Sequence, residues 1–151
     1  MLFIFNDGGR SNSGYKGKAG DCVCRSISIV SGIPYSDVYD YLACGAGKER
    51  RTKGRSARDG INTSRKWFKS LMKEWGFVWT PTMHIGSGCI VHLDDNELPN
   101  GRLVVSLSKH YTAVIDGIIY DTFNPQRTSL ICENGVTRIV RRCVYGYWKY
   151  R

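Results

Sequence analysis

The amino-acid sequence predicts an α+β protein in which helices precede an antiparallel sheet. As far as Gly76, apolar residues recur at the spacing of one helix face, whereas short runs rich in β-branched and aromatic residues follow it. The chain has 151 residues, of which 42% are hydrophobic and 12% aromatic, and these values are typical of one folded domain. We therefore expect a single domain over residues 1–151, with the N-terminal helices packed on the sheet.

Three helices are expected in the first half of the chain. The first begins at Asp21, whose side chain is suited to an N-cap, and ends before Gly32, which favours the left-handed conformation after a helix. Almost every residue of this helix is small or apolar, which predicts burial on most sides. The other two are expected over 37–44 and 63–75, and a short edge strand at 2–5 and a glycine-rich loop at 6–20 come before all three.

The second half predicts strands that are separated by turns. Asp116-Gly117 is a strong signal for a two-residue hairpin turn, and Pro81 confines the first run to an edge or irregular strand. The runs expected to form strands are 77–83, 90–93, 103–107, 110–115, 118–122, 129–132 and 136–147.

Cys22 is the first candidate functional residue. It is expected in the first turn of a helix, where free backbone N–H groups and the helix dipole favour an anion. A thiol there should ionise more readily than a free cysteine, and the thiolate is the nucleophilic form. Cys24 is the rival, but two residues along a helix turn by about 200°, so both thiols cannot face one partner. A buried structural cysteine is the alternative interpretation.

His110 is the second candidate, because it begins one strand of the predicted hairpin. With a two-residue turn at 116–117, His110 pairs opposite Phe123 and Asp121 shares its face on the diagonal. One extra loop residue would instead bring Asn124 opposite the imidazole. Either polar side chain would bond Nδ1 and leave Nε2 as the base. The alternative is a packed strand histidine beside a carboxylate that closes a turn.

This order of cysteine, histidine and Asn/Asp resembles the papain-like cysteine peptidases. The pairs Asp21-Cys22 and Asn124-Pro125 are most similar to the bacteriocin-processing branch, which has Asp-Cys and Asp-Pro at these places. The chain also resembles small phage and bacterial proteins that carry no known activity. The shared sequence motifs are Gly-Asp-Cys-Val at 20–23, Pro-Thr-Met at 81–83, Ile-Gly-Ser-Gly-Cys at 85–89 and Gly-Arg-Leu-Val-Val at 101–105.

The resemblance implies a papain-like fold and a cysteine-dependent hydrolase, whether peptidase, isopeptidase or amidase, that forms an acyl-enzyme on a peptide or protein substrate. Cys22 would be the nucleophile and His110 the base, with Asn124 or Asp121 orienting the histidine.

The backbone N–H of Cys22 would form part of the oxyanion hole. The peptidases of this family place a glutamine six residues before the nucleophile as a further oxyanion donor. This chain departs from them with Lys16 at that position, which would supply positive charge, and Asn12 is the other candidate donor.

Positive charge supports a different class of function. The chain carries a net charge of +9, from 22 Lys and Arg against 13 Asp and Glu, which favours acidic partners. The most basic segment is the predicted loop 45–60, which is either a solvated loop or a contact surface for nucleic acid or an acidic protein. The rival function is therefore a non-catalytic binding protein on the same scaffold, and its candidate contacts are Arg50, Arg51, Lys53 and Arg55.

Neither an export signal nor a membrane segment is expected. The N-terminus lacks the basic region of a signal peptide, and no apolar run approaches the roughly 18 residues of a membrane span. We expect a cytoplasmic protein, in the host cytoplasm if it is phage-encoded, whose six cysteines are reduced thiols. Cys22, Cys24, His84, Cys89, His92, Cys132 and Cys143 offer ligands for a metal, but their spacings match no standard zinc module. No metal or other cofactor is expected.

Overall fold

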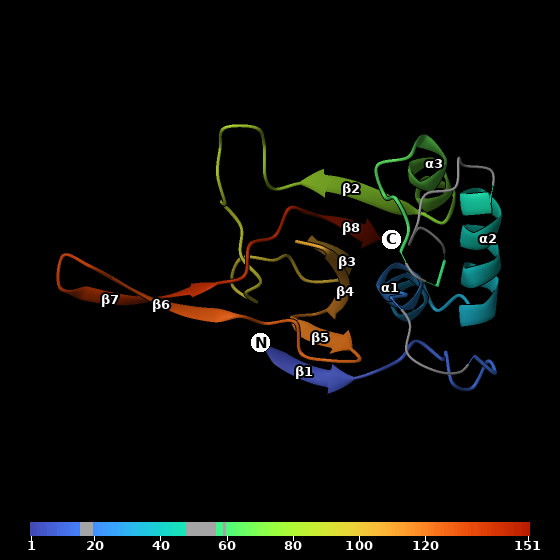
Figure 1. The fold of residues 1–151 in the computed structure, drawn as a ribbon, viewed down its shortest axis with the longest axis horizontal. Coiled ribbons are helices and arrows are strands. Elements are labelled where there is room, and N and C mark those ends of the chain that lie inside the picture. The colour runs from blue at the N-terminus through green and yellow to red at the C-terminus, as the bar shows by residue number, and fades with distance from the viewer. Residues whose placement is uncertain (16–19, 48–56, 59) are drawn as a thin grey trace.

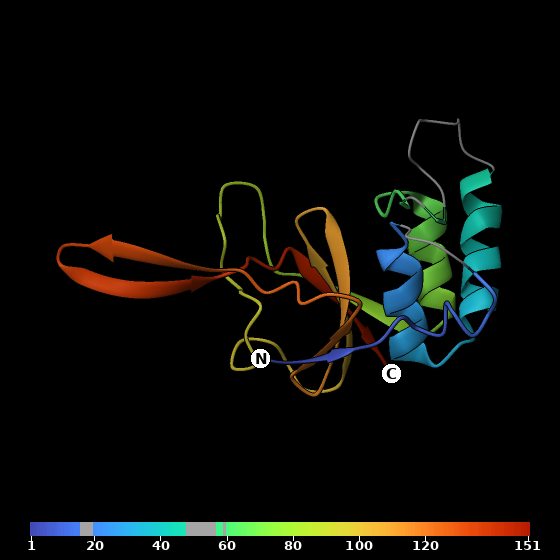
Figure 2. The ribbon, with the colours of Figure 1, turned by 60° about the horizontal axis from the view of Figure 1, so that its bottom comes forward.

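The computed structural model describes residues 1–15, 20–47, 57–58 and 60–151. In these residues, three helices pack against one side of a six-stranded sheet, and a separate two-stranded hairpin projects from the opposite end (Figure 1). Figure 2 shows the helices side by side and the hairpin extending away from them. The predicted α+β class, with helices before a mostly antiparallel sheet, is confirmed.

The helices are α1 (Cys22–Ser31), α2 (Tyr35–Gly47) and α3 (Lys66–Glu74). As predicted, α1 is buried on most sides and ends at Gly32, whose φ of 77° lies in the left-handed region. The third helix begins later than predicted, because Thr63 lies in a turn and Arg65 takes the N-cap position. Among the described residues, no helix combines the length and the apolar character that crossing a membrane requires.

Six of the strands form one sheet in the order β1-β5-β4-β3-β8-β2. The edge strand β1 runs parallel to β5, and the other neighbours are antiparallel. The strand that contains Pro81 lies at the opposite edge, as predicted. The strands are β1 (Leu2–Phe5), β2 (Phe77–Pro81), β3 (Arg102–Leu107), β4 (His110–Ile115), β5 (Ile118–Asp121), β6 (Thr128–Glu133), β7 (Val136–Arg141) and β8 (Gly146–Tyr150).

Two predicted strands are wrong. The run 90–93 makes a single bridge, between His92 and Cys143, and is otherwise irregular. The run 136–147 is two strands, because β7 pairs with β6 in the projecting hairpin whereas β8 joins the main sheet between β3 and β2. Between β7 and β8 the chain passes from the hairpin to the main sheet. The composition stays rich in strand-forming residues across this connection, so the sequence does not indicate where one strand ends and the next begins.

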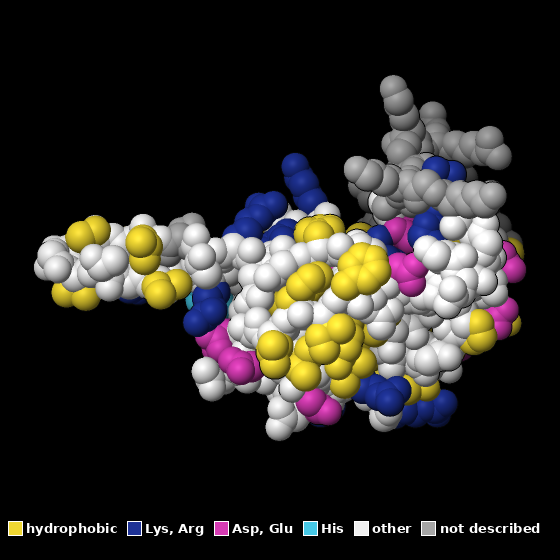
Figure 3. Space-filling model, turned by 90° about the horizontal axis from the view of Figure 1, so that it is seen from below, with side chains coloured by type: hydrophobic (Ala, Val, Ile, Leu, Met, Phe, Trp, Pro, Cys, Tyr) yellow, Lys and Arg dark blue, Asp and Glu magenta, His cyan; other side chains and the backbone are white. Residues whose placement is uncertain are grey.

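The projecting hairpin of β6 and β7 exposes apolar side chains. Leu130, Val136 and Ile139 are each more than half exposed, at 74%, 66% and 61%. Figure 3 shows hydrophobic side chains at several places on this projection.

Two hydrophobic cores occupy the two sides of the main sheet. Side chains alternate along β3, so that Val104 faces the helices while Leu103 and Val105 face away. The core beneath the helices includes Ile27, Val38, Leu42, Phe68, Met72, Val104, Ala113 and Trp148. The second core includes Leu93, Leu98, Leu103, Val105, Leu107, Val114, Ile119 and Val144.

Cys89 and Cys143 form a disulfide, with their Cα atoms 5.8 Å apart. The prediction that all six cysteines are reduced thiols is therefore wrong for these two. The bridge between His92 and Cys143 brings the loop of Cys89 against the chain that links β7 to β8, and a sequence separation of 54 gives no local signal for this pairing. The free cysteines among the described residues are Cys22, Cys24, Cys44 and Cys132.

Loss of this disulfide is expected to lower the free energy of unfolding by up to about 4 kcal/mol, the chain-entropy value for a loop of this length. The double variant Cys89→Ser, Cys143→Ser should show the loss in urea denaturation. Replacement of the exposed Cys44 by Ser is the control and should change the free energy by no more than about 0.5 kcal/mol. Equal stabilities for the double variant and the native protein would contradict the prediction.

Candidate active site

Cys22 is the first residue of α1 and lines a cleft of about 720 Å³. Burial raises the pKa of its thiol. This effect is outweighed by a hydrogen bond with His110, the positive charge of that ring and the backbone N–H of Tyr111, so the pKa lies below the ordinary 9.0. The thiolate is thus favoured in a cleft that a substrate can enter.

His110 is the first residue of β4 and is positioned by a tight turn from β3. Leu107 pairs with His110, and Lys109 between them adopts a φ of 56° in the left-handed region. The Nε2 atom of His110 lies 2.7 Å from Oδ2 of Asp121. Burial alone would lower the pKa of His110, but the hydrogen bonds with Asp121 and Cys22 raise it above 6.5.

The ring of His110 is turned the other way from the prediction. Asp121 bonds Nε2, which leaves Nδ1 as the nitrogen for Cys22. The hydroxyl of Thr112, further along β4, donates to the same Asp121 oxygen at 2.8 Å and holds the carboxylate at the far end of the ring. The base of the proposed dyad is therefore Nδ1.

Asp121 ends β5 and has a buried, fully bonded carboxylate. Oδ2 accepts from His110 and Thr112, while Oδ1 accepts from the backbone N–H of Thr122 at 2.7 Å and from Arg25 at 3.2 Å. Burial raises the pKa of this carboxyl, but the bond and charge of His110, together with Thr112 and Thr122, hold it below 3.8. An ionised carboxylate thus fixes the orientation of the imidazole.

Asn124, the other predicted orienting residue, is not brought to His110. The turn has two residues, with Ile115 paired to Ile118, and this register selects Asp121. Asn124 is exposed, and its Oδ1 accepts from both the backbone N–H and the side-chain amide of Gln126 at 3.1 Å, which closes a local turn.

Asp21 precedes α1 but does not cap it with its side chain. Its buried carboxylate instead bonds Arg25, accepts from the hydroxyl of Tyr35 at 2.6 Å and lies 3.7 Å from the guanidinium of Arg10. The predicted side-chain N-cap is therefore wrong, because the buried cations compete for the carboxylate. The first backbone N–H groups of α1 are left without this bond.

Arg25 is a site residue that the sequence interpretation missed. It is only 6% exposed and joins Asp21 to Asp121, so α1 is tied to the strand that carries the orienting carboxylate. A recognisable signal is present: an arginine stands one turn after an aspartate within an otherwise small and apolar helix.

Cys24 is excluded as the nucleophile by its surroundings. Its side chain is fully buried, and its Sγ lies 3.8 Å from the carbonyl oxygen of Tyr35. Burial is the main cause that raises the pKa of this thiol to about 12. A neutral thiol without access to the cleft is unreactive.

The remaining candidates lie elsewhere. Asn12 is exposed in a separate depression of about 390 Å³. His92 contacts Glu97, with Nδ1 and Oε1 3.2 Å apart, and His84 is exposed. In the part of the chain that the structure describes, no three His, Cys, Asp or Glu side chains come together as a metal site would need. Lys16, Arg50, Arg51, Lys53 and Arg55 lie outside the described residues.

Comparisons of the chain with protein-family models, with curated proteins and with solved structures find no match. Its function has therefore to be inferred from the side chains themselves.

Proposed function

We propose that the protein is a cysteine-dependent hydrolase of papain-like type, which cleaves an amide, isopeptide or thioester bond through an acyl-enzyme. One observation carries this proposal: Cys22 of α1 and His110 of β4 line one cleft and interact there, and the buried Asp121 of β5 bonds the far side of the imidazole. The pKa of Cys22 is lowered and that of His110 is raised, so the pair favours thiolate and imidazolium.

In the proposed reaction, the thiolate of Cys22 attacks the carbonyl carbon of the substrate. The proton on Nδ1 of His110 passes to the departing nitrogen or sulfur as the bond to carbon breaks, which leaves a thioester on Cys22. His110 then takes a proton from water as the water oxygen attacks the thioester, and breakage of the carbon–sulfur bond releases the acid product and restores the Cys22 thiolate beside the imidazolium. Asp121 holds the ring in place throughout.

The start of α1 supports the negative oxygen that forms during each attack. The first backbone hydrogen bond of the helix runs from the N–H of Arg25 to the carbonyl oxygen of Asp21. The N–H groups of Cys22 and Val23 therefore have no acceptor within the helix. The carboxylate of Asp21 does not cap them, and the helix dipole adds partial positive charge. We propose that the N–H of Cys22 binds the oxyanion.

An activated ester, p-nitrophenyl acetate, tests this function. We expect a burst of one p-nitrophenolate per chain, with the acetyl group located on Cys22 by mass spectrometry. Cys22→Ala should reduce the burst rate by at least about 100-fold, whereas the matched variant Cys24→Ala should keep it. Acetylation that falls equally on the exposed Cys44 and Cys132 would contradict the proposal. A non-catalytic binding protein would then be the better interpretation.

A further inference from the structure

A second cavity adjoins the catalytic cleft. Its volume is about 560 Å³, and it shares Thr63, Ser106, Tyr111 and Tyr145 with the cleft that holds Cys22. A molecule bound in one cavity can therefore extend into the other. Neither Cys22, His110 nor Asp121 lines this second cavity, so the catalytic side chains do not account for it.

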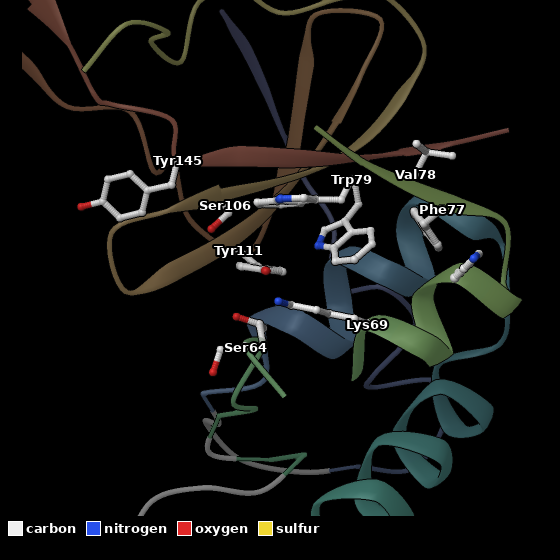
Figure 4. A pocket seen from close by; sticks show the side chains of 11 residues that line it. Ser64, Lys69, Phe77, Val78, Trp79, Ser106, Tyr111 and Tyr145 are labelled. Carbon is white, nitrogen blue, oxygen red and sulfur yellow. The ribbon is translucent and has the colours of Figure 1, made fainter. Parts of the chain in front are cut away.

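Aromatic rings form much of its wall. Trp79 of β2 and Trp148 of β8 face one another, with their ring centroids 5.1 Å apart, and Tyr111 of β4 lies beside them. Figure 4 shows the rings of Trp79 and Tyr111 next to one another, with Lys69 extending past them. Trp79 keeps 38% of its surface exposed, which is a large apolar area to leave in water. A cavity of this size and lining suits an aromatic or branched apolar group.

Two lysines of α3, Lys69 and Lys73, bring positive charge to the same cavity. Figure 4 shows Lys69 reaching across the space toward Tyr111 and Ser64. No acidic side chain is among the described residues that line the cavity. A negative charge on the occupant would therefore meet two cations without a competing carboxylate.

We infer that this cavity is the specificity subsite of the proposed enzyme, and that it selects a substrate with a large apolar, preferably aromatic, side chain next to a carboxylate. The inference rests on the proposed function. The rings hold the apolar group, and Lys69 and Lys73 bind the carboxylate.

Gly146 determines where the ring of Trp79 lies. A Cβ atom at this position would stand 2.4 Å from the Trp79 ring, which is too close for the ring to stay in place. The same Cβ would stand 2.9 Å from the backbone oxygen of Thr80, so Gly146→Ala moves the Trp79 ring and the adjoining end of β2 without replacing any group of the proposed triad.

Three activated esters test the subsite: p-nitrophenyl acetate, N-acetyl-phenylalanine p-nitrophenyl ester and N-succinyl-phenylalanine p-nitrophenyl ester. Their rates of acylating Cys22 are divided by their rates with free cysteine, which removes intrinsic reactivity. We expect the acetyl-phenylalanine ester to exceed the acetate by at least about tenfold through burial of its ring. The succinyl ester should gain a further factor of about three to ten, which decreases as salt is added.

The double variant Lys69→Gln, Lys73→Gln should lose the extra rate of the succinyl ester and keep the advantage of the acetyl-phenylalanine ester over the acetate. Gly146→Ala should reduce that advantage of the phenylalanine ring. Lys66→Gln, on the same helix but outside the cavity, is the matched control and should change neither. If all three esters acylate Cys22 at equal normalised rates, the subsite is refuted while the proposed hydrolase stands.

If no ester acylates Cys22, the hydrolase fails, and equilibrium binding then decides on the cavity alone. Quenching of tryptophan fluorescence would measure binding of N-succinyl-phenylalanine amide and N-acetyl-phenylalanine amide. Tighter binding of the succinyl compound that depends on Lys69 and Lys73 supports the site. Equal or undetectable binding of the two overturns it.

Discussion

Replacement of His110 by Gln is expected to slow the alkylation of Cys22 at neutral pH by at least about tenfold. The histidine supplies the hydrogen bond and charge that hold the pKa of Cys22 below 9.0, whereas burial acts in the opposite direction. Without the imidazole, burial dominates and the pKa rises, and each unit of increase reduces the thiolate near neutral pH about tenfold. Rates of carboxamidomethylation by iodoacetamide, measured from acid to alkaline pH with site assignment, should show the midpoint moving upward.

The matched control is His92→Gln. His92 also contacts a carboxylate, Glu97, at 3.2 Å, but it does not line the cleft that holds Cys22. Its replacement should leave the alkylation profile of Cys22 unchanged. A profile for His110→Gln that coincides with that of the native protein would mean that Cys22 is a structural cysteine.

Arg25→Met is expected to reduce the free energy of unfolding by about 3–5 kcal/mol, because removing one partner leaves buried charge uncompensated. Asp21 and Asp121 are each only 2% exposed, and both bond this guanidinium. Each carboxylate keeps other hydrogen bonds, so the lower end of the range is expected. Urea denaturation monitored by circular dichroism measures the change.

Arg25→Lys and Arg102→Met are the comparison variants. A lysine keeps the charge but lacks the planar fork that bridges two carboxylates, so Arg25→Lys should recover only part of the loss. Arg102 is exposed and donates to the carbonyl oxygen of Val30, and its replacement should cost no more than about 1 kcal/mol. If the change at Arg25 is as small as the change at Arg102, the bridge does not stabilise the fold.

Local signals in the sequence were sufficient to select Cys22 and His110, which the fold brings to the same cleft. Asp116-Gly117 predicts the turn that aligns β4 with β5, and a cysteine at the start of a buried helix predicts a nucleophile. The choice between Asp121 and Asn124 stayed open because it depends on one residue of turn length. The nitrogen of His110 that faces Cys22 depends on where Thr112 holds Asp121, which is a contact across strands.

Contacts between segments distant in the sequence could not be predicted. Trp79 and Trp148 are paired in register on β2 and β8, but the β-rich run before β8 gives no sign that the chain changes sheets there. The disulfide between Cys89 and Cys143 depends on the same change of direction. The second cavity follows from these pairings and is therefore a property of the fold.

The long separation in sequence within the candidate site determines when Cys22 gains the partner that lowers its pKa. Arg25 and Asp121 are 96 residues apart in the chain, so Cys22 is synthesised long before the strands that carry its partners. Until β4 and β5 fold onto α1, the thiol lacks the imidazole that lowers its pKa and behaves as an ordinary cysteine. Contacts so distant in sequence also form slowly. The lowered pKa of Cys22 is thus a property of the folded chain that a nascent chain does not yet have.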